Sequence, residues 1–133
     1  MTSQFVWFAI LMAANGLLLF LLTANVSRLR IKYQVSLGDG DNKSLAKAIR
    51  AHANGVEQLP VFALLVLALC LLSFSPFTLA ALVIAFTVAR VLHAIGMLTK
   101  AFAARRIGAA LTYLLQLGAV ICVILALLGV AVN

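Results

Sequence analysis

Three long stretches of the chain contain no Asp, Glu, Lys or Arg: residues 1–26, 59–89 and 107–133. A helix needs about 20 mostly apolar residues to cross a bilayer, so the first and last stretches each fit one crossing. The middle stretch is interrupted by SFSPF at residues 73–77, whose Ser and Pro favour a turn, and fits two helices. The pattern predicts an all-α fold: an integral membrane four-helix bundle, in a single domain over residues 1–133. Spans are expected at about residues 5–26, 45–72, 77–100 and 107–132.

The composition supports a membrane protein and excludes a soluble one. Hydrophobic residues make up 65% of the chain and charged residues 10%, whereas about 25% is typical of soluble domains. A secretory signal peptide would need basic residues before its apolar core, and MTSQ at the start has none, so we expect the first span to be retained. Cys70 and Cys122 fall inside predicted spans and are expected to pack as small apolar side chains.

The first loop contains GDGDN at residues 38–42, which is typical of a turn. It begins like a calcium-binding loop, but Lys43 and Arg50 occupy positions where such a loop needs oxygen ligands. No metal site is therefore expected. Asn42 or Ser44 is expected to cap the second helix.

The basic residues predict the orientation in the membrane. Nine of the ten lie in or beside the first and third loops: Arg28, Arg30, Lys32, Lys43, Lys47, Arg50, Lys100, Arg105 and Arg106. The positive-inside rule then places both loops in the cytoplasm and both termini outside, in what we expect to be a bacterial inner membrane. The net charge of +7 favours contact with anionic membrane lipids. Nucleic acid is not an expected partner, because no aromatic residues interleave with the basic ones.

Several polar side chains fall inside the predicted spans. Arg50, Asn54 and Glu57 are spaced i, i+4, i+7 and share one helical face. Counted at about 1.5 Å per residue from residue 72, Glu57 lies about 22 Å from the outer end of its helix. Arg90 and His93 share a face of the third helix, and an arginine facing lipid would cost at least about 2.5–3.5 kcal/mol. These residues predict a hydrated polar site in the cytoplasmic third of the membrane, with Arg28 and Arg106 at a similar depth.

Structural roles for the same residues remain alternatives. Arg28 is also expected as a topology or lipid anchor. Arg90 and Glu57 could form an ion pair that joins two helices, and His93 could serve packing. Tyr113 suits an interfacial anchor as well as a ligand contact.

The predicted site carries a net positive charge and suits an anionic ligand. Arginine binds carboxylates in bidentate geometry. Glu57 suits a ligand ammonium group, and the Asn54 amide can donate or accept a hydrogen bond. A small peptide with two carboxylates and one amine matches these groups. If such a peptide also carries a thiol, a guanidinium beside the sulfur would lower the thiol pKa and increase the thiolate fraction.

Three segments carry a family resemblance: SRLRIKYQVSLGDG, LAKAIRAHANGVEQLPVFALL and ARVLHAIGMLTKAFAARRIG. Together they resemble the MAPEG family, the membrane-associated proteins of eicosanoid and glutathione metabolism, and most of all its bacterial members. The most specific piece is R-A-H-x-N-x-x-E-x-x-P at residues 50–60. The resemblance implies a left-handed four-helix bundle assembled as a homotrimer. It also implies glutathione as co-substrate, bound between subunits near the cytoplasmic face.

The resemblance also implies roles for individual residues. Arg106 would stabilise the glutathione thiolate, with Arg105 as a rival. The substrate-binding candidates are Arg28, Arg50, Asn54, Glu57, Arg90, His93 and Tyr113. The chain departs from prostaglandin E synthase-like members, because Ala53 stands in place of an arginine, Met97 and Ala110 in place of tyrosines, and Ile107 in place of a serine.

Two functions are consistent with the sequence. The favoured one is a membrane-bound glutathione-dependent transferase or peroxidase that acts on a lipophilic electrophile. The alternative is a non-catalytic four-helix membrane transporter or lipid-binding oligomer. The first span has no acidic residue, which argues against proton-coupled antiport.

Overall fold

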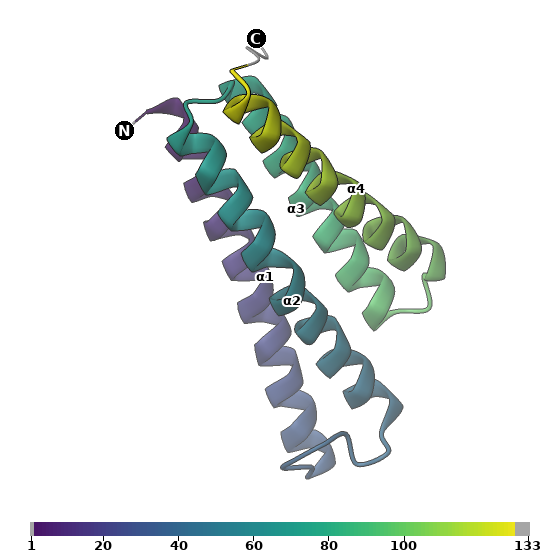
Figure 1. Cartoon of the computed structure of the whole chain (residues 1–133). Coiled ribbons are helices and arrows are strands. Elements are labelled where there is room, and N and C mark those ends of the chain that lie inside the picture. Colours follow the sequence, from purple (N-terminus) through teal and green to yellow (C-terminus); the bar gives the residue numbers. More distant parts are fainter. Residues whose placement is uncertain (1, 130–133) are drawn as a thin grey trace.

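The computed structural model describes residues 2–129. Those residues form four α-helices and no strand, which confirms the all-α prediction (Figure 1). The helices are α1 (Ser3–Tyr33), α2 (Lys43–Leu71), α3 (Pro76–Leu98) and α4 (Phe102–Leu127). Each is long and apolar enough to cross a membrane.

The helices differ from the predicted spans mainly at the ends that carry basic residues. α1 continues beyond residue 26 to Tyr33, and α4 begins at Phe102 rather than near residue 107. Lys and Arg favour helices, so a helix can continue after it leaves the apolar layer. Residues 130–132 of the fourth predicted span lie outside the described residues, and the span limits themselves stay a prediction.

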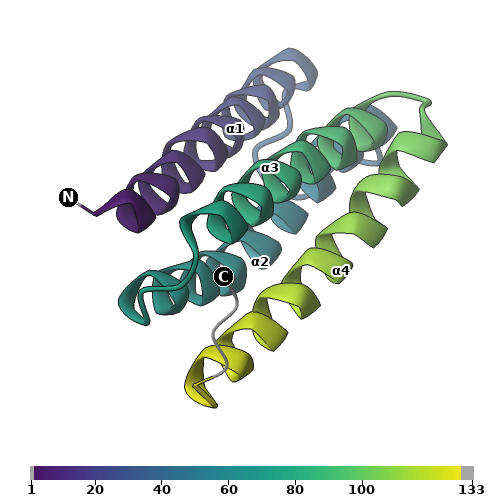
Figure 2. The same cartoon turned by 90° about the horizontal axis from the view of Figure 1, so that it is seen from above.

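The four helices alternate in direction. The start of α1, the 72–75 turn and the end of α4 lie at one end of the bundle (Figure 1). The 34–42 and 99–101 connections lie at the other, here called the basic end. Within residues 2–129, α1 packs on α2 and α3, α4 packs on the same two helices, and α1 and α4 do not touch (Figure 2). The α1–α2 and α3–α4 hairpins diverge toward the basic end (Figure 1).

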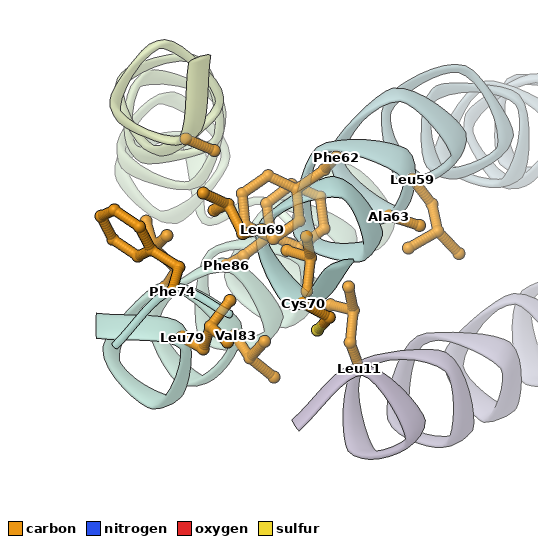
Figure 3. Close-up of a cluster of buried hydrophobic side chains, with 13 residues drawn as sticks. Leu11, Leu59, Phe62, Ala63, Leu69, Cys70, Phe74, Leu79, Val83 and Phe86 are labelled. Carbon is orange, nitrogen blue, oxygen red and sulfur yellow. The ribbon is translucent and has the colours of Figure 1, made fainter. Parts of the chain in front are cut away.

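The large apolar core fills the half of the bundle away from the basic end. Its centre is the stacked pair Phe62 and Phe86, whose ring centroids lie 3.7 Å apart with 4° between the ring planes (Figure 3). Leu11 from α1 and Leu79 from α3 are fully buried in the same cluster. Toward the basic end only two small buried clusters follow, each of three residues. The bundle is therefore densely apolar in one half, which leaves the other half for polar side chains.

Two glycines bring α3 and α4 into backbone contact near the basic end. A Cβ atom on Gly108 would lie 2.5 Å from the His93 nitrogen and 2.7 Å from the Ala89 oxygen. A Cβ on Gly96 would lie 2.6 Å from the Cα of Arg105. Small residues permit this approach between membrane helices. The contact places the first turns of α4 directly beside His93.

The first loop is held by the chain itself. Asn42 caps α2, because its Oδ1 accepts from the backbone nitrogens of Ser44 and Leu45, both at 3.0 Å. The predicted cap is therefore Asn42. Arg30 donates to three carbonyl oxygens of the loop, the shortest being that of Gly38 at 2.9 Å. Arg30 thus stabilises the first loop.

The α3–α4 contact generates a stability prediction. Gly108→Ala forces a methyl group against the backbone of α3, so we expect the free energy of unfolding to fall by about 1–3 kcal/mol. The measurement is denaturation of the detergent-purified protein. Gly118→Ala is the matched control in the same helix, because its added Cβ would meet no other helix and no side chain beyond its direct neighbours within 4 Å. That variant should be unchanged or gain up to about 1 kcal/mol from helix propensity. Equal stability of the two variants would contradict the prediction.

Candidate functional site

A cavity of about 480 Å³ opens between α2, α3 and α4 toward the basic end. Its lining residues are Arg50 and Asn54 from α2, His93 and Met97 from α3, and Arg105, Arg106 and Ala109 from α4. Four of the residues predicted from the sequence, Arg50, Asn54, His93 and Arg106, therefore meet at one cavity, together with the rival Arg105. The close α3–α4 packing explains why the two arginines of α4 reach His93.

Arg90 lies behind the cavity rather than in its lining. The residue is 3% exposed, and its Nη2 donates to Asn54 Oδ1 at 2.8 Å. Its Nη1 donates to Thr112 Oγ1 at 3.4 Å, and that hydroxyl in turn donates to the Gly108 carbonyl oxygen at 2.7 Å. One guanidinium therefore joins α2, α3 and α4 in a single layer. The Arg90–Glu57 ion pair considered as a structural alternative does not form in this chain, because Asn54 holds the guanidinium instead.

His93 is buried and incompletely satisfied. The residue is 6% exposed, and its Nδ1 has no hydrogen-bond partner among residues 2–129. A buried polar atom without a partner is uncommon in a folded protein and calls for an explanation such as an absent ligand or water. Because His93 also lines the cavity, a ligand there is one group that could satisfy it.

Three predicted residues lie away from this cavity. Arg28 is exposed on α1, where its Nη2 donates to Asn25 Oδ1 at 2.9 Å. Glu57 is exposed on α2, one turn beyond Asn54 on the side away from the basic end. Tyr113 is exposed and borders a separate cavity of about 250 Å³ on α4. Their predicted roles in binding stay predictions.

Three polar residues for which the sequence suggested no role make or lack notable contacts in the structure. Thr112 is fully buried and bonded to Arg90, but a threonine in an apolar helix gives no signal of its own. Gln116 beside Tyr113 has a buried Oε1 that finds no partner in the described part of the chain, and it is the single Asn or Gln in the sequence from residue 107 to 132. Asn15 donates to Thr87 Oγ1 at 3.0 Å and so links α1 to α3.

The cavity lining is strongly biased in charge. Three of its seven residues are arginines, and no acidic residue is among them. Arg90 adds a fourth guanidinium immediately behind Asn54. Guanidinium groups bind carboxylates, phosphates and sulfates through paired N–H donors. The arrangement suits an anionic ligand. This agrees with the net positive charge that the sequence predicted for the site.

Four apolar helices with a cation-lined cavity among three of them define a polytopic membrane protein with a candidate ligand site. The chain belongs to the MAPEG family, whose family model matches residues 8–125. It is 32% identical over 99 residues to inner membrane protein YecN of Escherichia coli K12, covering 74% of this chain and 76% of that protein. YecN of E. coli O6:H1 strain CFT073 matches to the same extent. A bacterial inner membrane protein is therefore among the relatives of this chain.

The layer around Arg90 generates a second prediction. Thr112→Val removes an acceptor for Arg90 and leaves a buried donor unsatisfied, so we expect a loss of about 1–3 kcal/mol in the free energy of unfolding. Thr23→Val is the control, because its exposed hydroxyl bonds only to Leu19 of its own helix. The control should change stability by less than about 0.5 kcal/mol. If both variants unfold alike in detergent, the layer does not stabilise the bundle.

Proposed function

We propose that the protein is a membrane-bound glutathione-dependent transferase or peroxidase that acts on a lipophilic electrophile. The observation that carries the proposal is the convergence of Arg50, Asn54, His93 and Arg106 from three helices on one cavity. Its volume of about 480 Å³ lies within the usual range of ligand sites, about 300–1,000 Å³. Membership of the MAPEG family supports glutathione as the co-substrate.

The cavity residues match the chemical groups of glutathione. In the proposed complex, Arg50 and Arg105 would bind its two carboxylates, and Asn54 would donate to its peptide oxygens; all three residues line the cavity. The ammonium group would need an acidic partner, and Glu57 is the acid nearest to the cavity in sequence. Because Glu57 is exposed and is not among the residues that line this cavity, we propose that this contact forms in an oligomer, with the ligand between neighbouring subunits.

A homotrimer is part of the proposal for the same reason. Arg28, Glu57 and Tyr113 are all exposed in the single chain at membrane-spanning helices. Polar and charged groups exposed to lipid are costly, so a protein partner is favoured over lipid for them. A second and third copy of the chain would cover these residues and complete the ligand site between subunits.

Arg106 is favoured over Arg105 as the thiolate partner. Arg106 borders two cavities at once: the cationic one, and an apolar one of about 410 Å³ lined by Ala103, Ile107 and Ala110. Arg105 lines the cationic cavity and is not among the residues that line the apolar one. A sulfur held at Arg106 therefore lies where a polar co-substrate and a lipophilic electrophile can meet. With an aryl halide, the thiolate forms the new S–C bond and the halide leaves with the electrons of the broken bond.

The arginines generate a third prediction. Arg106→Ala should abolish conjugation of glutathione to an aryl halide by the purified protein, because the thiolate loses its stabilising cation. Arg105→Ala is the matched control and should weaken glutathione binding, seen as a higher KM, while turnover remains. Size-exclusion chromatography checks that the oligomer is intact in both. Unchanged turnover in the Arg106 variant would exclude this residue from the mechanism.

The orientation is a further part of the proposal, with the basic end in the cytoplasm. In a protein carrying Cys70→Ala and Cys122→Ala, we expect a membrane-impermeant thiol reagent to label the Ser73→Cys variant in intact cells. The Leu37→Cys variant should be labelled only after lysis, although Leu37 is 87% exposed in the chain. The reverse pattern of labelling would contradict the positive-inside assignment.

A further inference from the structure

The structure points to Arg90 as a positioning residue whose counter-charge is the bound anion. We infer that its buried guanidinium does not touch the ligand. It fixes the orientation of the Asn54 amide and makes the cavity selective for groups that only accept hydrogen bonds. Sequence reasoning had placed Arg90 among the ligand contacts, whereas Asn54 stands between it and the cavity.

The first step is the charge of Arg90. The residue is 3% exposed, and both of its hydrogen-bond acceptors, Asn54 Oδ1 and Thr112 Oγ1, are neutral. Within residues 2–129, no carboxylate accepts from it. A buried ion without an opposite charge is strongly unfavourable, and the penalty is relieved when a counter-ion binds nearby. An anion in the adjacent cavity supplies that charge.

The second step is the direction of the Asn54 amide. Its Oδ1 is occupied by the Arg90 guanidinium, so the group left to meet a ligand is the Nδ2 amino group. The cavity then presents N–H donors from Asn54 and from three arginines, and His93 adds a buried Nδ1 that has no partner. Carboxylate, sulfate and phosphate groups match this set of donors, because in their ionised forms they accept hydrogen bonds and donate none.

The inference rests on the proposed function only in taking this cavity as the ligand site, and it can be tested apart from catalysis. Asn54→Asp keeps the size of the side chain and places a carboxylate directly on Arg90. Because the carboxylate replaces the missing counter-charge, we expect the unfolding midpoint of the ligand-free protein to rise. The same carboxylate repels anions, so the affinity for sulfate should fall at least tenfold.

Asn15→Asp is the matched control for the stability measurement. Asn15 is likewise an amide inside a membrane-spanning helix, but it is buried, whereas Asn54 is half-buried, and its partners are Thr87 Oγ1 and the Leu11 carbonyl oxygen, with no cation. The same substitution there should lower the unfolding midpoint. A lower midpoint for both variants, or an Asn54→Asp protein that binds sulfate as tightly as the parent, would overturn the inference.

The probes separate the sources of the anion. Thermal unfolding in lipid-free detergent is measured with sulfate, with glutathione, and with added phosphatidylglycerol. At 100 times its dissociation constant a ligand adds about 2.7 kcal/mol, which gives a measurable shift. Stabilisation of the parent, and not of an Arg90→Met variant, by any of the three supports the inference. A shift with sulfate but none with glutathione refutes the proposed function while leaving Arg90 in its role. No shift with any probe overturns both.

Discussion

The hydrogen bond between Arg90 Nη2 and Asn54 Oδ1 is the interaction on which the polar half of the bundle depends. Water is scarce at that depth, so each buried polar group needs a partner within the protein or a ligand. The guanidinium takes one acceptor from α2 and one from α4 while it is anchored on α3. It thereby sets the spacing of the three helices that enclose the cavity.

The backbone contact between α3 and α4 complements that hydrogen bond. Gly96 and Gly108 remove the side chains that would separate the helices, and the first turns of α4 come against His93. The close approach accounts for the position of Arg105 and Arg106, which would otherwise extend into the headgroup region as ordinary basic residues do. The two neighbouring arginines then differ in one respect: both line the polar cavity, and Arg106, unlike Arg105, also lines the apolar cavity beside Ala103.

The sequence was informative about the helices and about the net positive charge of the site, for identifiable reasons. Uncharged runs and one Ser/Pro turn determine four apolar helices, because bilayer thickness restricts the lengths that can cross it. Periodicity correctly grouped Arg50 with Asn54, which both line the cavity. It could not reveal that the Arg90 layer closes the cavity before Glu57, because that depends on the partner of Asn54. Thr112 was equally invisible, since its role arises from a contact with a residue 22 positions away.

The uneven distribution of apolar packing has a mechanical consequence. The stacked rings of Phe62 and Phe86 and their neighbours hold the hairpins together in one half of the bundle, whereas in the other half the described residues form small buried clusters and a cavity. A lateral force in the bilayer would therefore deform the half at the basic end more than the half that contains the aromatic stack.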